Sequence, residues 1–166
     1  MTIDARLAEL GIELPAVPKP IGAYVLSVQT GNLLYTSGIG PQRDGQFPYQ
    51  GQVGAELTIE EGRAAARLCM LNLLSLIRDA AGSLDRVARV VKVLGFVASA
   101  PGFGDQPLVM NGASELLLEV FGDRGRHAQR PRRLAGGVDA IHQQQARTRR
   151  QQGQRPGHPA PRSFPA

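Results

Sequence analysis

The sequence of 166 residues lacks tryptophan, contains a single cysteine, Cys69, and is poor in aromatic residues, which make up 5% of it. A lone thiol cannot form an internal disulfide or a cluster of thiolates around zinc, which excludes a disulfide scaffold and a cysteine-based zinc site. The core must therefore be aliphatic. Hydrophobic residues make up 42% of the sequence, which is enough to build one domain. We expect a protein of a reducing compartment, the cytoplasm.

Long apolar runs are missing as well. No stretch of about 18 apolar residues occurs, and residues 1–11 have neither the basic start nor the apolar centre of a signal peptide. We therefore expect neither a membrane span nor secretion.

Basic charge is scarce in most of the chain and dominates the rest. Residues 1–123 hold nine Lys and Arg against thirteen Asp and Glu, a net charge of −4. Residues 124–166 hold ten Arg, no Lys and one acid, Asp139, a net charge of +9. Because the body is acidic, the overall charge of +5 does not indicate a basic nucleic-acid-binding domain.

The first part of the body predicts a β-hairpin. Two β-rich runs, 24–29 and 33–37, are separated by Thr30-Gly31-Asn32, a typical turn sequence. Glycine, proline and turn residues then dominate up to residue 57, where we expect little regular structure.

A long helix is predicted next. Thr58 and Glu61 have the spacing of a capping box and open a helical pattern over 59–81, which Gly82 ends. One face is small and apolar, with Gly62, Ala66, Cys69, Leu73, Leu76 and Ala80, and the other is polar, with Glu60, Arg63, Arg67, Ser75 and Arg78. We expect this helix to cover a sheet.

A strand and a second helix complete the body. Residues 87–97 are almost continuously apolar, which predicts a central strand buried on both faces. Asp105 is a suitable N-cap for a helix that ends at Gly122. This order predicts a two-layer α+β sandwich with helices on one face of a mixed sheet, and the other face is left for a partner subunit.

The chain changes character at residue 129. The only large apolar residues beyond this point are Leu134, Val138, Ile141 and Phe164, too few to fold alone. We therefore divide the chain into a domain, 1–128, and a disordered Arg-, Pro- and Gln-rich tail, 129–166. Three interpretations of the tail stay open: a basic arm for RNA or anionic surfaces, a segment without a role, and the product of a shifted reading frame.

Few residues suggest chemistry by themselves. Gly38-Ile-Gly-Pro41 lacks the third glycine and the following helix of a dinucleotide site. The three histidines are too far apart in the sequence for a metal site, and they lie in or beside the tail: His127, His142 and His158. Cys69 on the apolar helix face is a buried, inert thiol by pattern. We expect neither a metal nor a cofactor.

Five segments occur in an order typical of one known family. They are 21–25 (IGAYV), 31–38 (GNLLYTSG), the helix opened by Thr58, 87–93 (VARVVKV) and 110–121, which begins Met110-Asn111. From about residue 18 to residue 128 the chain resembles the Rid family of enamine/imine deaminases, also called YjgF/YER057c/UK114 or L-PSP endoribonuclease.

The resemblance implies a chorismate-mutase-like α+β fold, a homotrimer and ligand clefts between subunits. It also implies hydrolysis of reactive enamines or imines of the 2-aminoacrylate type to a 2-keto acid and ammonia, without a cofactor. By their places in the matching motifs, Tyr24, Ser37, Gly38 and Asn111 would bind the substrate.

The family's substrate-binding arginine has no matching position. Relatives continue with an Ala-Arg-Ser type strand, a Leu-Pro turn and a Val-Glu-Val-Glu type final strand, whereas residues 125–131 read GRHAQRP and neither later motif follows. We therefore expect the final strands to be missing. Arg130 is a displaced candidate for the arginine that would hold the substrate carboxylate while water attacks the C=N carbon.

Two hypotheses follow for the function. The first is a Rid-like hydrolase of small imino acids that is impaired in this chain. The second is a non-catalytic module of the same fold that binds small carboxylates, or RNA through the Arg-rich tail.

Overall fold

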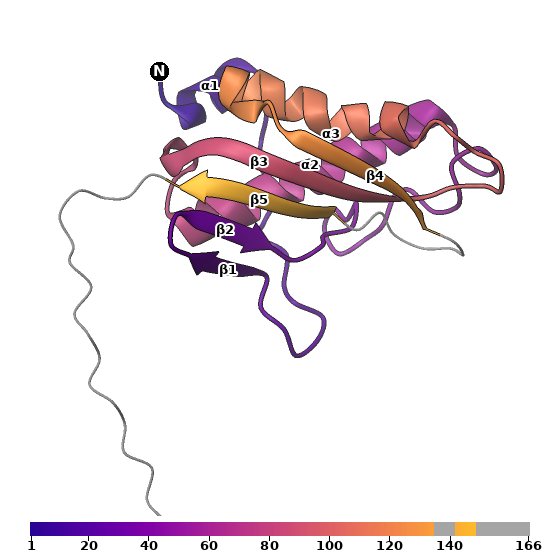
Figure 1. The fold of residues 1–166 in the computed structure, drawn as a ribbon, viewed down its shortest axis with the longest axis horizontal. Helices are drawn as coiled ribbons and strands as arrows, with labels where there is room; N and C mark the ends of the chain where they lie inside the picture. The colour runs from indigo at the N-terminus through magenta and orange to yellow at the C-terminus, as the bar shows by residue number, and fades with distance from the viewer. Residues whose placement is uncertain (135–141, 149–166) are drawn as a thin grey trace, which may run out of the picture.

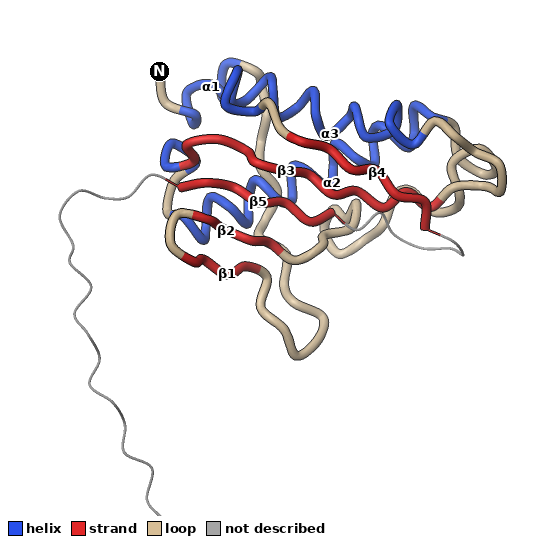
Figure 2. The backbone as a smooth tube through the Cα atoms, viewed as in Figure 1, coloured by secondary structure: helices blue, strands red, loops and turns tan. Residues whose placement is uncertain are grey.

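The computed structural model describes residues 1–134 and 142–148, and it has two layers, a sheet and the helices that cover one face of it (Figures 1 and 2). The helices and strands are α1 Ile3–Glu9, β1 Ser27–Thr30, β2 Leu33–Thr36, α2 Ile59–Ala81, β3 Val87–Ala98, α3 Gln106–Phe121, β4 Ala128–Leu134 and β5 His142–Thr148. The strand order is β1-β2-β5-β3-β4, with β3 and β4 parallel and the other pairs antiparallel. The predicted α+β sandwich with a mixed sheet is confirmed.

The hairpin forms at the predicted place. Thr30 pairs with Leu33, so that Gly31 and Asn32 alone make the turn. Gly31 has a φ of 55°, which suits the tight turns that connect twisted strands. As expected, the segment up to residue 57 contains turns and isolated bridges.

Helix α2 begins and ends as the sequence predicts. The Glu61 N–H donates to Thr58 Oγ1 (3.2 Å) and the Thr58 N–H donates to the Glu61 carboxylate (2.8 Å), which completes the capping box. Gly82 ends the helix with a φ of 78°.

The faces of α2 differ from the prediction at two positions. Ser75, expected on the polar face, is buried and donates a 2.6 Å hydrogen bond to the Pro15 carbonyl oxygen, whereas Ala80 is exposed. The buried arc is wider than a helix over a sheet requires, because the segment that precedes the hairpin also packs against α2.

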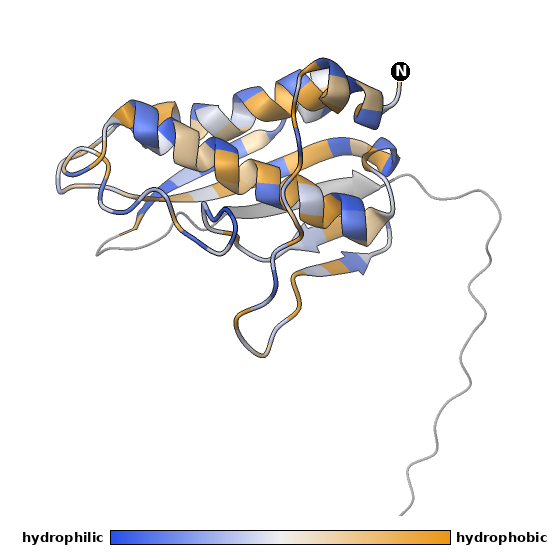
Figure 3. Cartoon of the chain, turned by 180° about the vertical axis from the view of Figure 1, so that it is seen from behind, coloured by the Kyte–Doolittle hydropathy of each residue, from blue (hydrophilic) through white to orange (hydrophobic). Residues whose placement is uncertain are grey.

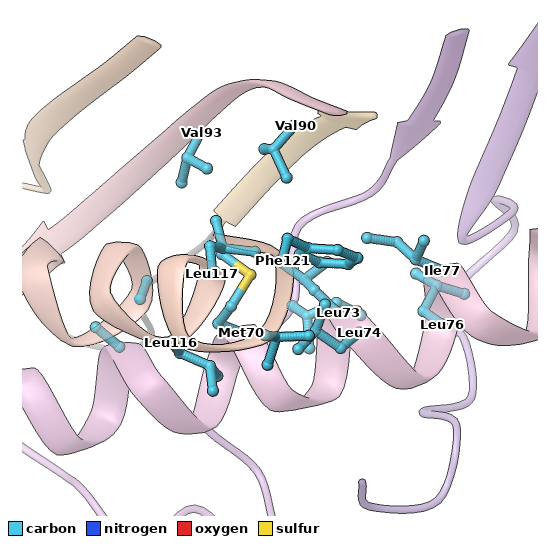
Figure 4. Close-up of a cluster of buried hydrophobic side chains, with 14 of the residues drawn as sticks. Met70, Leu73, Leu74, Leu76, Ile77, Val90, Val93, Leu116, Leu117 and Phe121 are labelled. Carbon is cyan, nitrogen blue, oxygen red and sulfur yellow. The ribbon is translucent and has the colours of Figure 1, made fainter. Parts of the chain in front are cut away.

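The core lies between the sheet and the two long helices. Figure 4 shows hydrophobic side chains of α2 meeting those of α3 and β3. The labelled residues are Met70, Leu73, Leu74, Leu76, Ile77, Val90, Val93, Leu116, Leu117 and Phe121, all 5% exposed or less. Cys69 is completely buried, as predicted. Seen from the helix side, hydrophilic and hydrophobic residues alternate along α2 and α3 (Figure 3).

Helices α2 and α3 approach each other closely at Gly112. A Cβ atom at this position would overlap the backbone carbonyl oxygen of Arg63. Two ion pairs flank the contact, Arg63 with Glu115 (2.8 Å) and Arg67 with Glu119 (2.7 Å). Glycine is therefore required at the point where the two helices meet.

Strand β3 is internal, as predicted, but only one of its faces is buried. Val87, Val90, Val93 and Val97 are at most 2% exposed beneath the helices. On the other face Val91 is 36% exposed. In the single chain, the expectation of burial on both faces is wrong, because residues 1–134 and 142–148 form no layer over this second face.

Two strands come from the segment that we expected to be a disordered tail. β4 pairs with β3 over seven residue pairs, and β5 is inserted between β2 and β3. The prediction that the final strands are missing is therefore wrong. It rested on the absence of the family's Leu-Pro turn and Val-Glu-Val-Glu type strand, and the expected disorder rested on the scarcity of apolar side chains. Strands, however, pair through backbone groups, which any sequence without those motifs and even polar residues supply. Residues 135–141 and 149–166 lie outside the described residues, and the domain boundary at residue 128 stays a prediction.

Helix α1 was not predicted. Thr2 caps it, and Ile3 and Leu7 bury one side of its two turns. The Ile3 N–H donates to Asp85 (2.9 Å) and Arg6 donates to the Glu119 carbonyl oxygen (3.0 Å), so tertiary contacts hold this short helix. None of the helices in the described ranges is long and apolar enough to span a membrane.

Candidate functional site

The residues proposed from the sequence lie at two opposite edges of the sheet. Tyr24, Ser37 and Gly38 adjoin the ends of β1 and β2, whereas Arg130 is in β4. β5 and β3 separate β2 from β4, which at the usual strand spacing amounts to about 14 Å. One chain therefore does not bring these residues into one site.

At the β1–β2 edge, hydrogen bonds hold Ser37 against the two residues that follow Tyr24. Ser37 Oγ donates to the Val25 carbonyl oxygen (2.7 Å), and the Ser37 N–H donates to the Leu26 carbonyl oxygen (2.8 Å). The Tyr24 side chain is 46% exposed. The Gly38 N–H donates to no group in the described part of the chain. This edge offers a phenol hydroxyl and a backbone donor to a ligand.

The β4 edge presents arginines on the uncovered face. Arg130 pairs with Leu94 and Arg132 with Phe96, and these β3 residues alternate with the buried Val93 and Val97. Both arginines are exposed. Ser37 follows β2 at about the level of Leu94, as the pairing of β2 through β5 to β3 shows, so both candidate groups lie at similar heights along the strands.

Asn111 lies in α3, in the helix layer, on the side of the sheet where β4 forms the edge. It lies one turn before Ser114 on α3, and Ser114 contacts His127 and Gln129 at the start of β4. Asn111 is half-buried. The structure therefore brings Asn111 near the strand of Arg130 and places it away from Tyr24 and Ser37.

The sequence reasoning missed the cluster of Ser114, His127 and Gln129. The His127 Nδ1–H donates to the Gly125 carbonyl oxygen (2.6 Å), which leaves Nε2 as an acceptor for the Ser114 hydroxyl (3.2 Å). These bonds fix the start of β4 against α3. The sequence signal for this cluster was His127 itself, a polar ring just before β4, whose role as a hydrogen-bonding residue the sequence reasoning did not weigh.

Concave surfaces occur elsewhere. A groove of about 590 Å³ lies between the loop 43–49 and α2, and a second, of about 650 Å³, lies beside α1. A small apolar pocket of about 40 Å³ lies under Val53 and Val109. None of these three includes the residues proposed from the sequence. Within residues 1–134 and 142–148, no group of three His, Cys, Asp or Glu is placed to hold a metal ion.

Two carboxylates near these surfaces have perturbed acidity. The pKa of Glu56 is lowered because its carboxylate accepts the Gln52 N–H (2.8 Å), and the pKa of Glu61 is lowered because its carboxylate accepts the Thr58 N–H and hydroxyl. Both bonds stabilise the charged form. Each stabilises local backbone, and neither group adjoins the sheet edges that carry the candidate residues.

Comparison with known proteins gives consistent matches. Residues 4–133 match the family model described as "YjgF/chorismate_mutase-like, putative endoribonuclease". "Protein TCP17" of Trypanosoma cruzi is 49% identical over 128 residues, which are 76% of this chain and 80% of that protein.

Two crystal structures are also similar. One is described as a "putative endoribonuclease" of Shewanella oneidensis, with a TM-score of 0.85, 34% identity, and coverage of 89% of this chain and 99% of that one. The other is protein Atu1372 of Agrobacterium tumefaciens, described as of unknown function, with a TM-score of 0.81, 37% identity, and coverage of 89% and 94%.

The structural likeness extends further along the chain than the match to the family model. The match to the family model ends at residue 133. The two crystal structures each align with 89% of this chain, which is more than residues 4–133 comprise. Fold, sequence motifs and relatives agree, and the chain belongs to the YjgF/chorismate mutase-like family, also known as the Rid or L-PSP family.

Proposed function

We propose that this chain hydrolyses small imino acids at sites that two copies of the chain complete together. The separation of Tyr24, Ser37 and Gly38 from Arg130 carries this proposal. A ligand that contacts both groups needs the β4 edge of one copy beside the β1–β2 edge of another. Because each copy joins the next through two different edges, only a ring leaves no edge unpaired. We therefore propose a cyclic homotrimer.

The uncovered sheet face supports this association. Val28, Tyr35 and Val91 are 55%, 38% and 36% exposed on it, and Leu94 and Phe96 are half-buried beside them. Burying apolar surface contributes about 25 cal/mol per Å². Three copies that turn these faces toward one another would remove them from water.

The chemistry follows from the groups at the two edges. The Arg130 guanidinium would hold the substrate carboxylate in two hydrogen bonds, while the Gly38 N–H and the Tyr24 hydroxyl orient the imine. Because the Ser37 hydroxyl donates to Val25, its free lone pair would accept from the substrate or from water. Water adds to the C=N carbon and ammonia leaves, so an imino acid and water give a keto acid and ammonia. We place this activity in the cytoplasm.

The test is hydrolysis of freshly generated 2-iminopropanoate by three proteins: the chain as it stands, Arg130→Ala, and a version whose residues after 128 are encoded in the alternative reading frame. The present chain should be slow, because Arg130 stands out of the family's register. The reframed version should exceed the present chain in kcat/KM by about a hundredfold, the effect of a two-bond carboxylate contact in register, and Arg130→Ala should lower the remaining activity of the present chain further. Rapid turnover that Arg130→Ala leaves unchanged would refute the role of Arg130.

Exposed arginines of β4 favour a second function. Arg130, Arg132 and Arg133 are exposed on an edge strand, where phosphate groups of RNA have access. RNA binding of this kind weakens steeply with salt. Binding of single-stranded RNA that is lost between 50 and about 200 mM salt, without imine hydrolysis, would favour this function over the first.

A further inference from the structure

A groove on the helix side of the molecule carries charges that the fold itself does not use. It lies between the loop that contains Arg43 and Asp44 and the outer side of α2. The lining residues are Arg43, Asp44, Gln46, Pro48, Tyr49, Ala64, Arg67, Leu68 and Leu71, around a volume of about 590 Å³. None of them belongs to the sheet edges discussed above.

The loop is held in place by hydrogen bonds. Asn72 of α2, which is 1% exposed, donates to the carbonyl oxygens of Gly40 (3.2 Å) and Gln42 (2.8 Å). Arg43 and Gln46 exchange two backbone hydrogen bonds of 2.8 and 2.9 Å across the turn. The backbone that carries the two charges is therefore fixed relative to α2.

The two arginines of the groove differ in what they bind. Arg67 is held by the Glu119 carboxylate in two hydrogen bonds of 2.7 and 3.2 Å, so its charge is neutralised. Arg43 and Asp44 form no ion pair or side-chain hydrogen bond with any described residue, including each other. The groove thus offers one free cation and one free anion on consecutive residues, whose Cα atoms are about 3.8 Å apart.

Apolar surface continues from these charges. Leu68 and Leu71 form the α2 side of the groove, and Tyr49 forms part of the loop side. Tyr49 also lines the apolar pocket of about 40 Å³ under Val53 and Val109. A ligand whose charges rest on Arg43 and Asp44 can therefore place an aliphatic group against the leucines and Tyr49.

We propose that this groove binds a free amino acid with an aliphatic side chain. The Arg43 guanidinium binds the α-carboxylate, the Asp44 carboxylate binds the α-ammonium group, and the side chain packs against Leu68, Leu71 and Tyr49. A zwitterion fits because it carries one charge of each sign, as the unpaired Arg43 and Asp44 of the groove do. An anion alone would meet the repulsion of Asp44, and a cation alone that of Arg43.

The test is calorimetric titration of the full chain with L-leucine, together with three probes that each lack one part of it. These are 4-methylpentanoate without the ammonium group, 3-methylbutylamine without the carboxylate, and glycine without the side chain. Leucine should bind with a Kd in the millimolar range, and each probe at least about tenfold more weakly. No leucine binding up to about 20 mM, or equal binding of 4-methylpentanoate, would overturn the proposal.

Matched variants locate the site. Arg43→Gln and Asp44→Asn should each weaken leucine binding at least about tenfold. Asn suits the positive φ of 53° at Asp44, so the turn is retained. Arg126→Gln and Asp123→Asn, which alter an exposed ion pair outside the groove, are the controls and should leave binding unchanged.

Arg130→Ala separates this proposal from the proposed function. If it abolishes leucine binding while Arg43→Gln does not, leucine binds at the sheet edges and the groove proposal is wrong. If Arg43→Gln abolishes leucine binding and imine hydrolysis is absent altogether, the groove proposal stands and the proposed function fails.

Discussion

The two faces of the sheet have the same strands but opposite surroundings. In β3, Val90 and Val93 are completely buried beneath α2 and α3, while Val91 between them is 36% exposed on the other face. The valines are chemically identical, so the difference lies only in what covers them. Side chains of the covered face stabilise the folded chain itself, whereas those of the open face are available to stabilise contacts with another molecule.

The largest effect should come from a cavity in the covered layer. Leu73→Ala removes a completely buried side chain between α2 and the sheet, and it should lower the free energy of unfolding by about 3.5 kcal/mol. Leu108→Ala, at a leucine that is 46% exposed on α3, is the matched control and should cost under about 1 kcal/mol. Denaturant titrations of both variants provide the measurement, and equal losses would show that the covered layer is not a packed core.

The close approach of the two helices should be the next most sensitive feature. Gly112→Ala places a methyl group against the Arg63 carbonyl oxygen, so α2 and α3 must move apart, and the free energy of unfolding should fall by about 2 kcal/mol. Gly104→Ala is the control, because its Cβ would meet nothing within 4 Å. Denaturant unfolding of Gly112→Ala at parental stability would contradict the helix contact described here.

A charge on the open face should act differently. Val91→Lys should change the unfolding of the dissociated chain by under about 1 kcal/mol, because this side chain is already partly in water. It should nevertheless shift the mass in solution from three copies to one, which light scattering would measure. A well-behaved parental monomer would contradict the proposed association.

The smallest effect should be a loss of stability at acidic pH. The pKa of Glu61 is lowered in the folded chain, chiefly by its hydrogen bond with the Thr58 N–H. A carboxyl group with a lowered folded pKa stabilises the fold above its unfolded pKa, and this contribution is lost as the pH falls through the folded pKa. Stability should therefore decline slightly as the pH falls below about 4.5, the ordinary glutamate value. Glu61→Gln should reduce this decline in melting experiments, and an unchanged pH profile would show that the capping carboxylate is not its source.

Local signals in the sequence account for most of the body. The Gly31-Asn32 turn, the capping box of Thr58 and Glu61, and Gly82 act on their own neighbours, so their effects can be inferred without the rest of the fold. Asp105 was placed correctly at the start of α3, although its side chain makes no capping bond.

Long-range pairing could not be inferred in the same way. Whether residues 142–148 form a strand depends on two unpaired strand edges, those of β2 and β3, which the composition of the segment does not indicate. The same holds for the candidate site. The motifs indicated Tyr24, Ser37, Gly38 and Asn111 singly, and Arg130 was a displaced candidate. Only the strand order shows that these residues lie at two opposite edges of the sheet.

The position of β5 sets a constraint on how this protein is made. A ribosome delivers residues 1–134 first, yet β2 and β3 meet no neighbour on their inner edges until residues 142–148 arrive between them. The nascent chain can pack its helices early, but its sheet stays divided, with two edges exposed to other nascent chains. Sheet closure waits for residues 142–148, so any premature stop before residue 142 would release a chain with a gap where its middle strand belongs.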